Sequence, residues 1–391
     1  MKPLAARTDA LRQSDIRAVT FEVNRVGGIN LGQGICDLAT PTPIVEATVE
    51  ALRDGSQIYT AYNGTQALRE AIADKALSFN GIPVEGPESV VVSTGSTGAF
   101  LATVLTLFEP GDEVILFEPF YGYHAGILRL HGVRSVAVPL TKGGGRWTFD
   151  PDRLADAITD RTKAVLVCTP ANPSGKVWSE SELAALYAEV ERHDLWVLTD
   201  EIYEHMVYEG RRHLSPASRD GAYPRTITLS GFSKTFNMTG WRLGYAVAPA
   251  EVAEKIGLVN DLTTICAPAP LQHGLAAALP LPEAYYTQML ADYTAKRTRM
   301  VDALRACGFD ADPPEGAYYV LAGLGDRLGT PGFENARAAT TTLIETAGVA
   351  CVPGPSFFAD PADGAGYLRF CYAKEASVLD EACDRLVDAF G

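Results

Sequence analysis

Several polar groups in the chain directly follow short apolar segments, a position that parallel strands place at one edge of a sheet. Together they offer anion-binding groups, a carboxylate and an amine. In chain order they are Thr94–Gly98 after residues 89–93, Asn172 after 163–168, Asp200 and Tyr203 after 195–199, and Lys234 and Arg242 after 225–229. An amine in this position, flanked by small residues, can form an imine with a carbonyl.

Each group also has a simpler explanation when it is considered alone. The loop at 95–98 is typical of a turn that caps a helix, although small residues there also leave N–H groups free for a phosphate. Asn172 fits an ordinary Asn-Pro turn. Asp200 fits an exposed capping carboxylate, although a carboxylate after a buried strand is costly without a cation or metal. A lysine is usually solvated, but Lys234 follows an apolar strand in a weakly charged stretch.

The combination favours a site for pyridoxal 5′-phosphate (PLP). Its ring nitrogen needs a carboxylate, its 3′-oxygen needs amide and hydroxyl donors, its aldehyde needs a lysine, and its phosphate needs amides, hydroxyls and an arginine. The matching groups are Asp200 for the nitrogen, Asn172 and Tyr203 for the oxygen, Lys234 for the aldehyde, and the loop 94–98 with Arg242 for the phosphate.

Short strands and helices alternate in the segments that position these groups. Seven runs are continuously apolar and β-branched, which suits an α/β domain with a mostly parallel sheet covered by helices on both faces. They are residues 89–93, 112–117, 133–139, 163–168, 195–199, 225–229 and 244–248. Helices are expected at 98–108, 123–131 and 180–193, and Ser179 is the expected N-cap of the last one.

The pattern changes after about residue 283. A long helix is expected at 283–307, followed by α+β structure with strands at 317–321, 349–352 and 368–371. We therefore predict an N-terminal arm at 1–44 that is also part of the small domain, a large PLP-binding domain at 45–283, and a small C-terminal domain at 284–391.

Composition excludes several classes of function. The chain has 391 residues and a formal net charge of −15, so it lacks the basic face that nucleic acids require. It has no apolar stretch of membrane-spanning length and no signal-peptide core, and we expect a cytoplasmic protein without membrane contact. The seven cysteines form no CxxC pair, and no histidine joins them at metal-ligand spacing. We expect reduced thiols and no metal.

Over nearly its whole length the chain resembles the class I/II aminotransferases of PLP fold type I, in the aspartate aminotransferase superfamily and with likeness to kynurenine, glutamine and methionine aminotransferases. The most specific motif is KTFNMTGWRLG at 234–244, which is similar to the family's lysine-attachment signature. The motifs INLGQG at 29–34, NPSG at 172–175 and DEIY at 200–203 fit as well. The resemblance implies a large domain with a seven-stranded sheet and a smaller α+β domain.

The resemblance also implies residue roles. Lys234 would hold PLP as a Schiff base and act with Asp200 and Tyr203 in catalysis. The further cofactor-binding residues would be Gly95, Ser96, Thr97, Tyr121, Asn172, Ser233, Arg242 and Tyr59, and the substrate-binding residues Gly34, Asn172 and Arg369. Arg369 would bind the substrate α-carboxylate; the alternative is a surface arginine on an edge strand.

An assembly and two backbone features follow from the same resemblance. Tyr59 would reach the phosphate of the partner subunit, which implies a homodimer with shared active sites, and Tyr62 is the competing residue for this contact. Cis peptide bonds are expected at Glu118-Pro119 and Asn172-Pro173.

Two positions depart from the family pattern. Gly231 stands where many relatives have a phosphate-binding serine, so Ser230 or Ser233 is expected to replace that bond. Cys36 stands where relatives usually have proline. We expect a buried thiol there, and the alternative is a residue that faces the substrate.

The expected reaction is a ping-pong transamination between an L-amino acid and a 2-oxo acid, which are small-molecule substrates. Another PLP reaction on the same scaffold, such as β-elimination or a synthase or cyclase reaction, stays open, and product analysis distinguishes it. A transcription regulator with an aminotransferase-like domain would need a DNA-binding domain. The acidic charge and the mere 30 or so residues before Gly32 argue against it.

The donor class is predicted from missing cations. Aspartate-specific relatives bind the distal carboxylate with an arginine of the partner subunit or with a lysine of the phosphate loop. Here residues 259–268 contain no Lys or Arg, and Thr97 takes the place of the lysine. A second carboxylate would be buried unpaired, so we expect uncharged or aromatic donors, with apolar surface from residues 16–21 over the side chain. The alternative is that Arg17 or another basic residue binds dicarboxylates.

Overall fold

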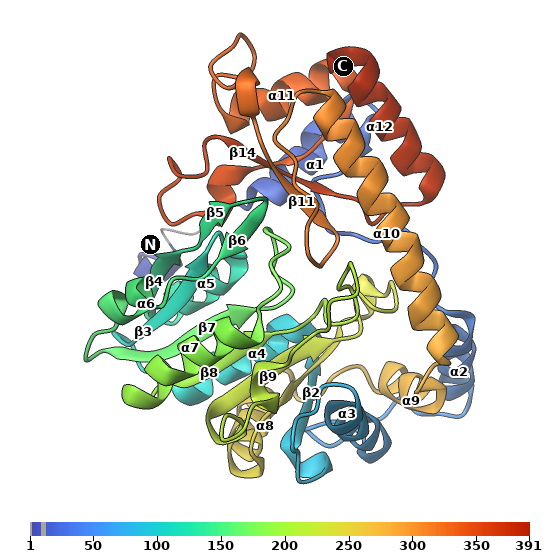
Figure 1. The fold of residues 1–391 in the computed structure, drawn as a ribbon. Coiled ribbons are helices and arrows are strands. Elements are labelled where there is room, and N and C mark those ends of the chain that lie inside the picture. Colours follow the sequence, from blue (N-terminus) through green and yellow to red (C-terminus); the bar gives the residue numbers. More distant parts are fainter. Residues whose placement is uncertain (1, 9–12) are drawn as a thin grey trace.

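The computed structural model of the chain describes residues 2–8 and 13–391. A larger part is built on a seven-stranded sheet and a smaller part on a three-stranded sheet, and the long helix α10 (Glu283–Ala306) runs from one part to the other (Figure 1). In the described part of the chain, no helix is both long enough and apolar enough to span a membrane.

The large sheet has the strand order β2-β10-β9-β8-β7-β3-β4. Its strands are β2 (Val90–Thr94), β3 (Glu113–Glu118), β4 (Arg134–Pro139), β7 (Thr162–Cys168), β8 (Trp196–Asp200), β9 (Thr226–Gly231) and β10 (Leu243–Val247). Only β10 runs antiparallel to its neighbours, and the remaining pairs are parallel. The predicted mostly parallel sheet of seven strands is confirmed.

Helices cover both faces of this sheet, which explains the continuous apolar runs of its strands. In β3, Val114 and Leu116 belong to the core formed with α4, α5 and α8, whereas Ile115 and Phe117 belong to the core formed with α6 and α7. The helices are α4 (Gly95–Leu107), α5 (Gly122–Leu130), α6 (Pro151–Ala157), α7 (Glu180–Arg192) and α8 (Ala250–Thr264). Ser179 is the N-cap of α7, as predicted, and forms a capping box.

Three more helices pack together beside the β2 edge of the sheet. They are α2 (Thr42–Arg53), α3 (Gln66–Ser78) and α9 (Ala269–Ala278). Together they bury the apolar side chains of Ile44, Leu68 and Leu275. This cluster continues the core of the large part toward the start of α10 (Figure 1).

The small part contains an antiparallel sheet with the order β11-β14-β13. Its elements are β11 (Tyr319–Gly323), α11 (Ala336–Ala347), β12 (Val349–Ala350), β13 (Val352–Pro353), β14 (Tyr367–Cys371) and α12 (Ala376–Phe390). The N-terminal elements α1 (Asp15–Arg25) and β1 (Ile29–Asn30) pack with it, because β1 pairs with β12. The domain boundaries at 44/45 and 283/284 stay predictions.

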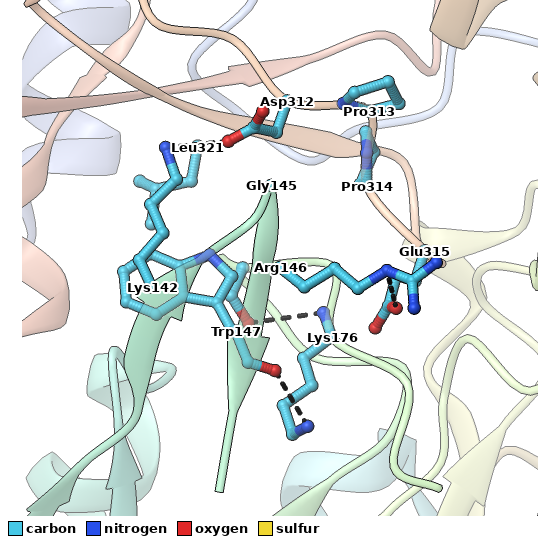
Figure 2. A pocket seen from close by; sticks show the side chains of 11 residues that line it. Lys142, Gly145, Arg146, Trp147, Lys176, Asp312, Pro313, Pro314, Glu315 and Leu321 are labelled. Atoms are coloured by element: carbon cyan, nitrogen blue, oxygen red, sulfur yellow. Dashed lines mark hydrogen bonds and ion pairs between the residues drawn. The ribbon is translucent and has the colours of Figure 1, made fainter.

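One hairpin was not expected from the sequence. The strands β5 (Thr141–Gly143) and β6 (Arg146–Thr148) form it, and it contacts the small part through ion pairs (Figure 2). Lys142 Nζ lies 3.0 Å from Asp312 Oδ2, and Arg146 Nε lies 3.5 Å from Glu315 Oε1. The hairpin is therefore a polar link between the two parts.

The backbone has both predicted cis peptide bonds, at Glu118-Pro119 and Asn172-Pro173. Thr169-Pro170 and Leu279-Pro280, which were not predicted, are cis as well. The first three of these bonds lie in the loops that directly follow β3 and β7.

Candidate active site

A cavity of about 220 Å³ lies where the loops after β2, β7, β8 and β9 meet α1 and β14. Every predicted site residue except Gly95 and Tyr59 lines it. These lining residues are Gly34, Ser96, Thr97, Tyr121, Asn172, Asp200, Tyr203, Ser233, Lys234, Arg242 and Arg369. The fold thus brings groups from both ends of the chain to one space.

Lys234 follows the end of β9 and is largely enclosed. Its Nζ donates to the carbonyl oxygen of Gly34 at 3.1 Å and lies 5.6 Å from the centre of the Tyr318 ring. The pKa of Lys234 is lowered to about 8, mainly because the amine is buried; the nearby Arg369 acts in the same direction, and Cys371, Cys36 and Asp200 oppose the shift. A larger fraction of this amine is therefore neutral near pH 7, as a nucleophile or base requires.

Asp200 ends β8 with a buried side chain, so the exposed capping carboxylate considered from the sequence is wrong. Its Oδ2 lies 3.0 Å from His124 Nε2, and its Oδ1 accepts from the backbone N–H of Ile202 at 3.2 Å. His124 was not predicted. It lies one helical turn after Tyr121, and the two rings meet edge to face with centres 5.3 Å apart. The spacing of three residues between Tyr121 and His124 places both side chains on one face of a helix, and this was the feature of the sequence that could have indicated His124.

Arg369 lies in β14, the central strand of the small sheet, and only 1% of it is exposed. The alternative of a surface arginine on an edge strand is therefore wrong. Its Nη1 donates to Asn172 Oδ1 at 2.8 Å and its Nη2 to the carbonyl oxygen of Gly32 at 2.7 Å. The guanidinium lies 4.2 Å from the ring centre of Tyr319 and 4.8 Å from that of Phe357. Among the described residues its Nε has no hydrogen-bond partner.

The start of α4 forms a cradle of backbone N–H groups. The N-cap residue Thr94 makes no side-chain hydrogen bond to them, so they stay available to an anion. Gly95 has φ +73°, and a Cβ there would lie 2.3 Å from Arg242 Nη2, so only glycine lets the guanidinium approach the loop. Ser230 bonds to Glu204 Oε1 at 3.1 Å, whereas Ser233 lines the cavity. Of the two serines, Ser233 is the one that can replace the missing serine at 231.

Tyr319 is a second residue that the sequence did not indicate. Its hydroxyl lies 3.1 Å from the Tyr203 hydroxyl. A Cβ on Gly34 would lie 1.9 Å from Tyr319 Oη, so glycine is needed at position 34 to admit this hydroxyl. Burial raises the pKa of Tyr203 well above its ordinary value and also raises the pKa of Tyr319, so both remain protonated donors near neutral pH.

The comparison with known proteins decides the family, because the family model described as "Aminotransferase class I and II" matches residues 26–386. The chain belongs to the class I and II aminotransferases. It is 36% identical over 371 residues to a probable N-succinyldiaminopimelate aminotransferase of Mycobacterium tuberculosis, covering 93% of this chain and 92% of the relative. It is 32% identical over 358 residues to the methionine aminotransferase of Escherichia coli, covering 92% and 91%. The solved aspartate aminotransferase of Thermus thermophilus with maleate superposes with a TM-score of 0.90, at 34% identity and full coverage of both chains.

An aminotransferase of this class is a PLP-dependent transaminase, and the chain has PLP fold type I. The cavity fits the cofactor on structural grounds. It offers an uncapped helix start beside Arg242 for a phosphate and a buried carboxylate, Asp200, for a ring nitrogen. The Lys234 amine, with its lowered pKa, suits the aldehyde.

Two further predicted residues of the aminotransferase lie outside the cavity. Tyr59 is 78% exposed and makes no contact with the cavity of its own chain, so its role toward a partner subunit stays a prediction. Tyr62 packs its ring on α8 of its own chain, where a Cβ on Gly257 would lie 2.6 Å from Tyr62 Cε2. This packing makes Tyr62 the weaker candidate for the contact with a partner.

Cys36 is a buried thiol, as expected, and does not line the cavity. Its Sγ donates to Asn237 Oδ1 at 2.9 Å and lies 3.3 Å from the Tyr293 hydroxyl. Burial raises the pKa of this thiol, which keeps it protonated and unreactive. The alternative in which Cys36 faces the substrate is not supported.

Proposed function

We propose that this aminotransferase moves an amino group from an L-amino acid with an uncharged or aromatic side chain to a 2-oxo acid, in a ping-pong cycle within a homodimer. The observation that carries the proposal is the convergence of the Lys234 amine, the Asp200 carboxylate and the Arg369 guanidinium on one cavity. One α-carboxylate site serves both substrates, so the first product leaves before the second substrate binds.

The proposed cofactor contacts follow from the chemistry of the lining. Bound PLP supplies a carbonyl that condenses with amines and an electron sink for the reacting α-carbon. Tyr121 would pack on the ring, and Asn172 and Tyr203 would donate to the 3′-oxygen. The phosphate would be held by the N–H groups of Gly95, Ser96 and Thr97, by the hydroxyls of Ser96, Thr97 and Ser233, and by Arg242, with Tyr59 of the partner subunit completing the site.

Arg369 is proposed to bind the substrate α-carboxylate. Its guanidinium is held in a fixed plane by two hydrogen bonds and two aromatic rings, and its buried Nε–H is left to donate to a ligand. Asn172 orients the guanidinium through its Oδ1, and Gly34 offers backbone close to the same place. A planar carboxylate matches this geometry better than a single point charge does.

Lys234 is proposed to be the base. With its amine free, Lys234 Nζ would take the proton from the substrate α-carbon. Burial lowers the pKa of this amine to about 8, which keeps part of it neutral near pH 7. Asp200 stays buried beside His124 and stabilises a positive charge that faces it from the cavity.

The donor class rests on the uncharged residues of the cavity wall, from which the exposed Arg17 is set apart. Thr97 lies in the cavity wall, and Ile16, Tyr121 and Tyr123 add apolar and aromatic surface. The relatives are named for N-succinyldiaminopimelate, methionine and aspartate. Family membership therefore supports transamination but does not indicate which amino acid is the donor.

A donor panel tests the proposal. The kcat/KM values for phenylalanine, methionine, glutamine and aspartate are measured with one common 2-oxo acid. We expect the uncharged donors to lead. An aspartate value that is about tenfold higher, equal to about 1.4 kcal/mol, overturns the donor class. Release of ammonia and pyruvate without consumption of a 2-oxo acid would instead indicate β-elimination.

A further inference from the structure

The cavity lining contains more positive charge than the proposed roles use. Among the residues that the structure describes, the cationic lining residues are Arg17, Lys234, Arg242 and Arg369, and the only acidic one is Asp200. This excess stands out in a chain whose formal net charge is −15. Arg242, Arg369 and Lys234 have proposed partners in the cofactor and the α-carboxylate, but Arg17 has none.

Arg17 lies on α1 with an exposed side chain. It forms no ion pair with any residue that the structure describes, in contrast to Arg25 at the end of the same helix, which pairs with Glu22 at 3.4 Å. An unpaired guanidinium in a cavity wall can bind an anion without first breaking a protein contact. Arg17 is therefore available to a ligand.

The helix that carries Arg17 is firmly held. Asp15, two residues earlier, accepts from Arg337 Nη1 at 2.9 Å and Nη2 at 3.0 Å and from Ser356 Oγ at 2.6 Å. Val19 is buried in the core between α1 and the small part. The backbone at Arg17 is thus fixed at the cavity wall, and only its side chain needs to move when a ligand binds.

Gln33 lines the same cavity. Its Oε1 accepts from Thr20 Oγ1 at 3.3 Å. This bond turns the amide so that its Nε2–H₂ group is left to donate to a ligand. A carboxylate bound by Arg17 can therefore also accept from an amide donor.

We propose that Arg17 binds the second, terminal carboxylate of the 2-oxo acid acceptor. The inference rests on the proposed function, in which the donor is uncharged and the same cavity then receives the acceptor. Arg369 is buried and Arg17 is exposed, so a ligand that contacts both extends from the inside of the cavity to its mouth. An uncharged donor leaves Arg17 solvated, at no cost in buried charge.

The positions of Arg17 and Arg369 also predict the preferred length of the acceptor's carbon chain. A terminal carboxylate on a longer acceptor, with five carbons, reaches the mouth better than that of a four-carbon acid. The amino acid formed from the acceptor carries the same carboxylate, so the contact serves both directions of the reaction. Glutamate should therefore be a better substrate than aspartate.

Binding of two unreactive ligands tests the contact directly. Glutarate and valerate have the same chain length and differ by the second carboxylate. Calorimetry gives their Kd values for the PLP-loaded wild-type enzyme, for Arg17→Met and for Arg25→Met. The Arg25→Met control removes the same charge from the same helix outside the cavity. The acceptors 2-oxoglutarate and 2-oxopentanoate form a matched pair for kcat/KM.

We expect wild-type enzyme and Arg25→Met to bind glutarate about five- to tenfold more tightly than valerate, as for a solvent-accessible, hydrogen-bonded ion pair. In Arg17→Met the Kd values of glutarate and valerate should agree within about twofold, and the Kd of valerate should be unchanged. The kcat/KM preference for 2-oxoglutarate over 2-oxopentanoate should fall by the same factor as the glutarate preference. A glutarate preference that persists in Arg17→Met, or is absent from wild type, overturns the inference. Failure of the donor proposal shows separately, as an aspartate lead in the donor panel.

Discussion

Asp200→Asn is the substitution whose effect can be worked out most fully. Asparagine keeps the size of the side chain and an oxygen for the N–H of Ile202, which the Asp200 Oδ1 accepts at 3.2 Å. It removes the negative charge that lies 3.0 Å from His124 Nε2 and lines the cavity. In the PLP-loaded enzyme Asp200 would face the protonated ring nitrogen of the cofactor, and removing one partner of such a buried charge pair costs about 3–5 kcal/mol. If this loss falls on the transition state, the rate drops by about two to four decades.

The assay is the donor half-reaction, followed by cofactor absorbance, with PLP occupancy measured separately. Glu201→Gln is the matched control, because Glu201 is also buried but bonds to His213 Nε2 at 2.7 Å and to Ser215 Oγ at 2.8 Å, outside the cavity. We expect this control to lower the Tm and to keep the rate within about threefold. An Asp200→Asn enzyme that binds PLP and stays within threefold of wild type refutes the role of the charge.

Three further results are expected. Because burial lowers the pKa of Lys234 to about 8, acetylation of this amine in the apoenzyme should rise between about pH 7 and 9 and then level off, and a midpoint near the ordinary value of about 10.4 would count against it. Arg369→Lys loses the planar fork and should raise the KM of amino acids about tenfold or more, and an unchanged KM would show that Arg369 does not bind the α-carboxylate. Sedimentation should show a homodimer, and the Tyr59→Phe variant should bind PLP more weakly than wild type. A fully active monomer would contradict this prediction.

Much of the fold was predictable because the sheet is buried on both faces. Strands such as β3 and β8 have a continuous run of apolar residues, VILF in β3 and WVL in β8, and polar residues follow this run at the strand end. The hairpin β5–β6 was missed because its residues are exposed or half-buried, so no apolar pattern marks it. Its position depends on ion pairs with the small part, which no local pattern encodes.

In the site, the sequence indicated the residues whose types are rare at strand ends, such as Lys234 and Asp200. It did not indicate His124 or Tyr319, because their roles depend on contacts across the fold. His124, on α5, meets the carboxylate of Asp200 at the end of β8, and the Tyr319 hydroxyl, from the small part, meets that of Tyr203. From the sequence Arg17 was only an alternative ligand for dicarboxylates, since the packing of α1 on the small part decides whether it reaches the cavity.

Borohydride reduction of the PLP-loaded enzyme tests whether PLP is attached to Lys234, on which the proposed function depends. Peptide mapping by mass spectrometry then locates the reduced cofactor. We expect the added mass on the peptide that contains Lys234, with no stable label and no transamination in Lys234→Ala. Label on a different lysine of the wild-type enzyme, or normal turnover by Lys234→Ala, would contradict it.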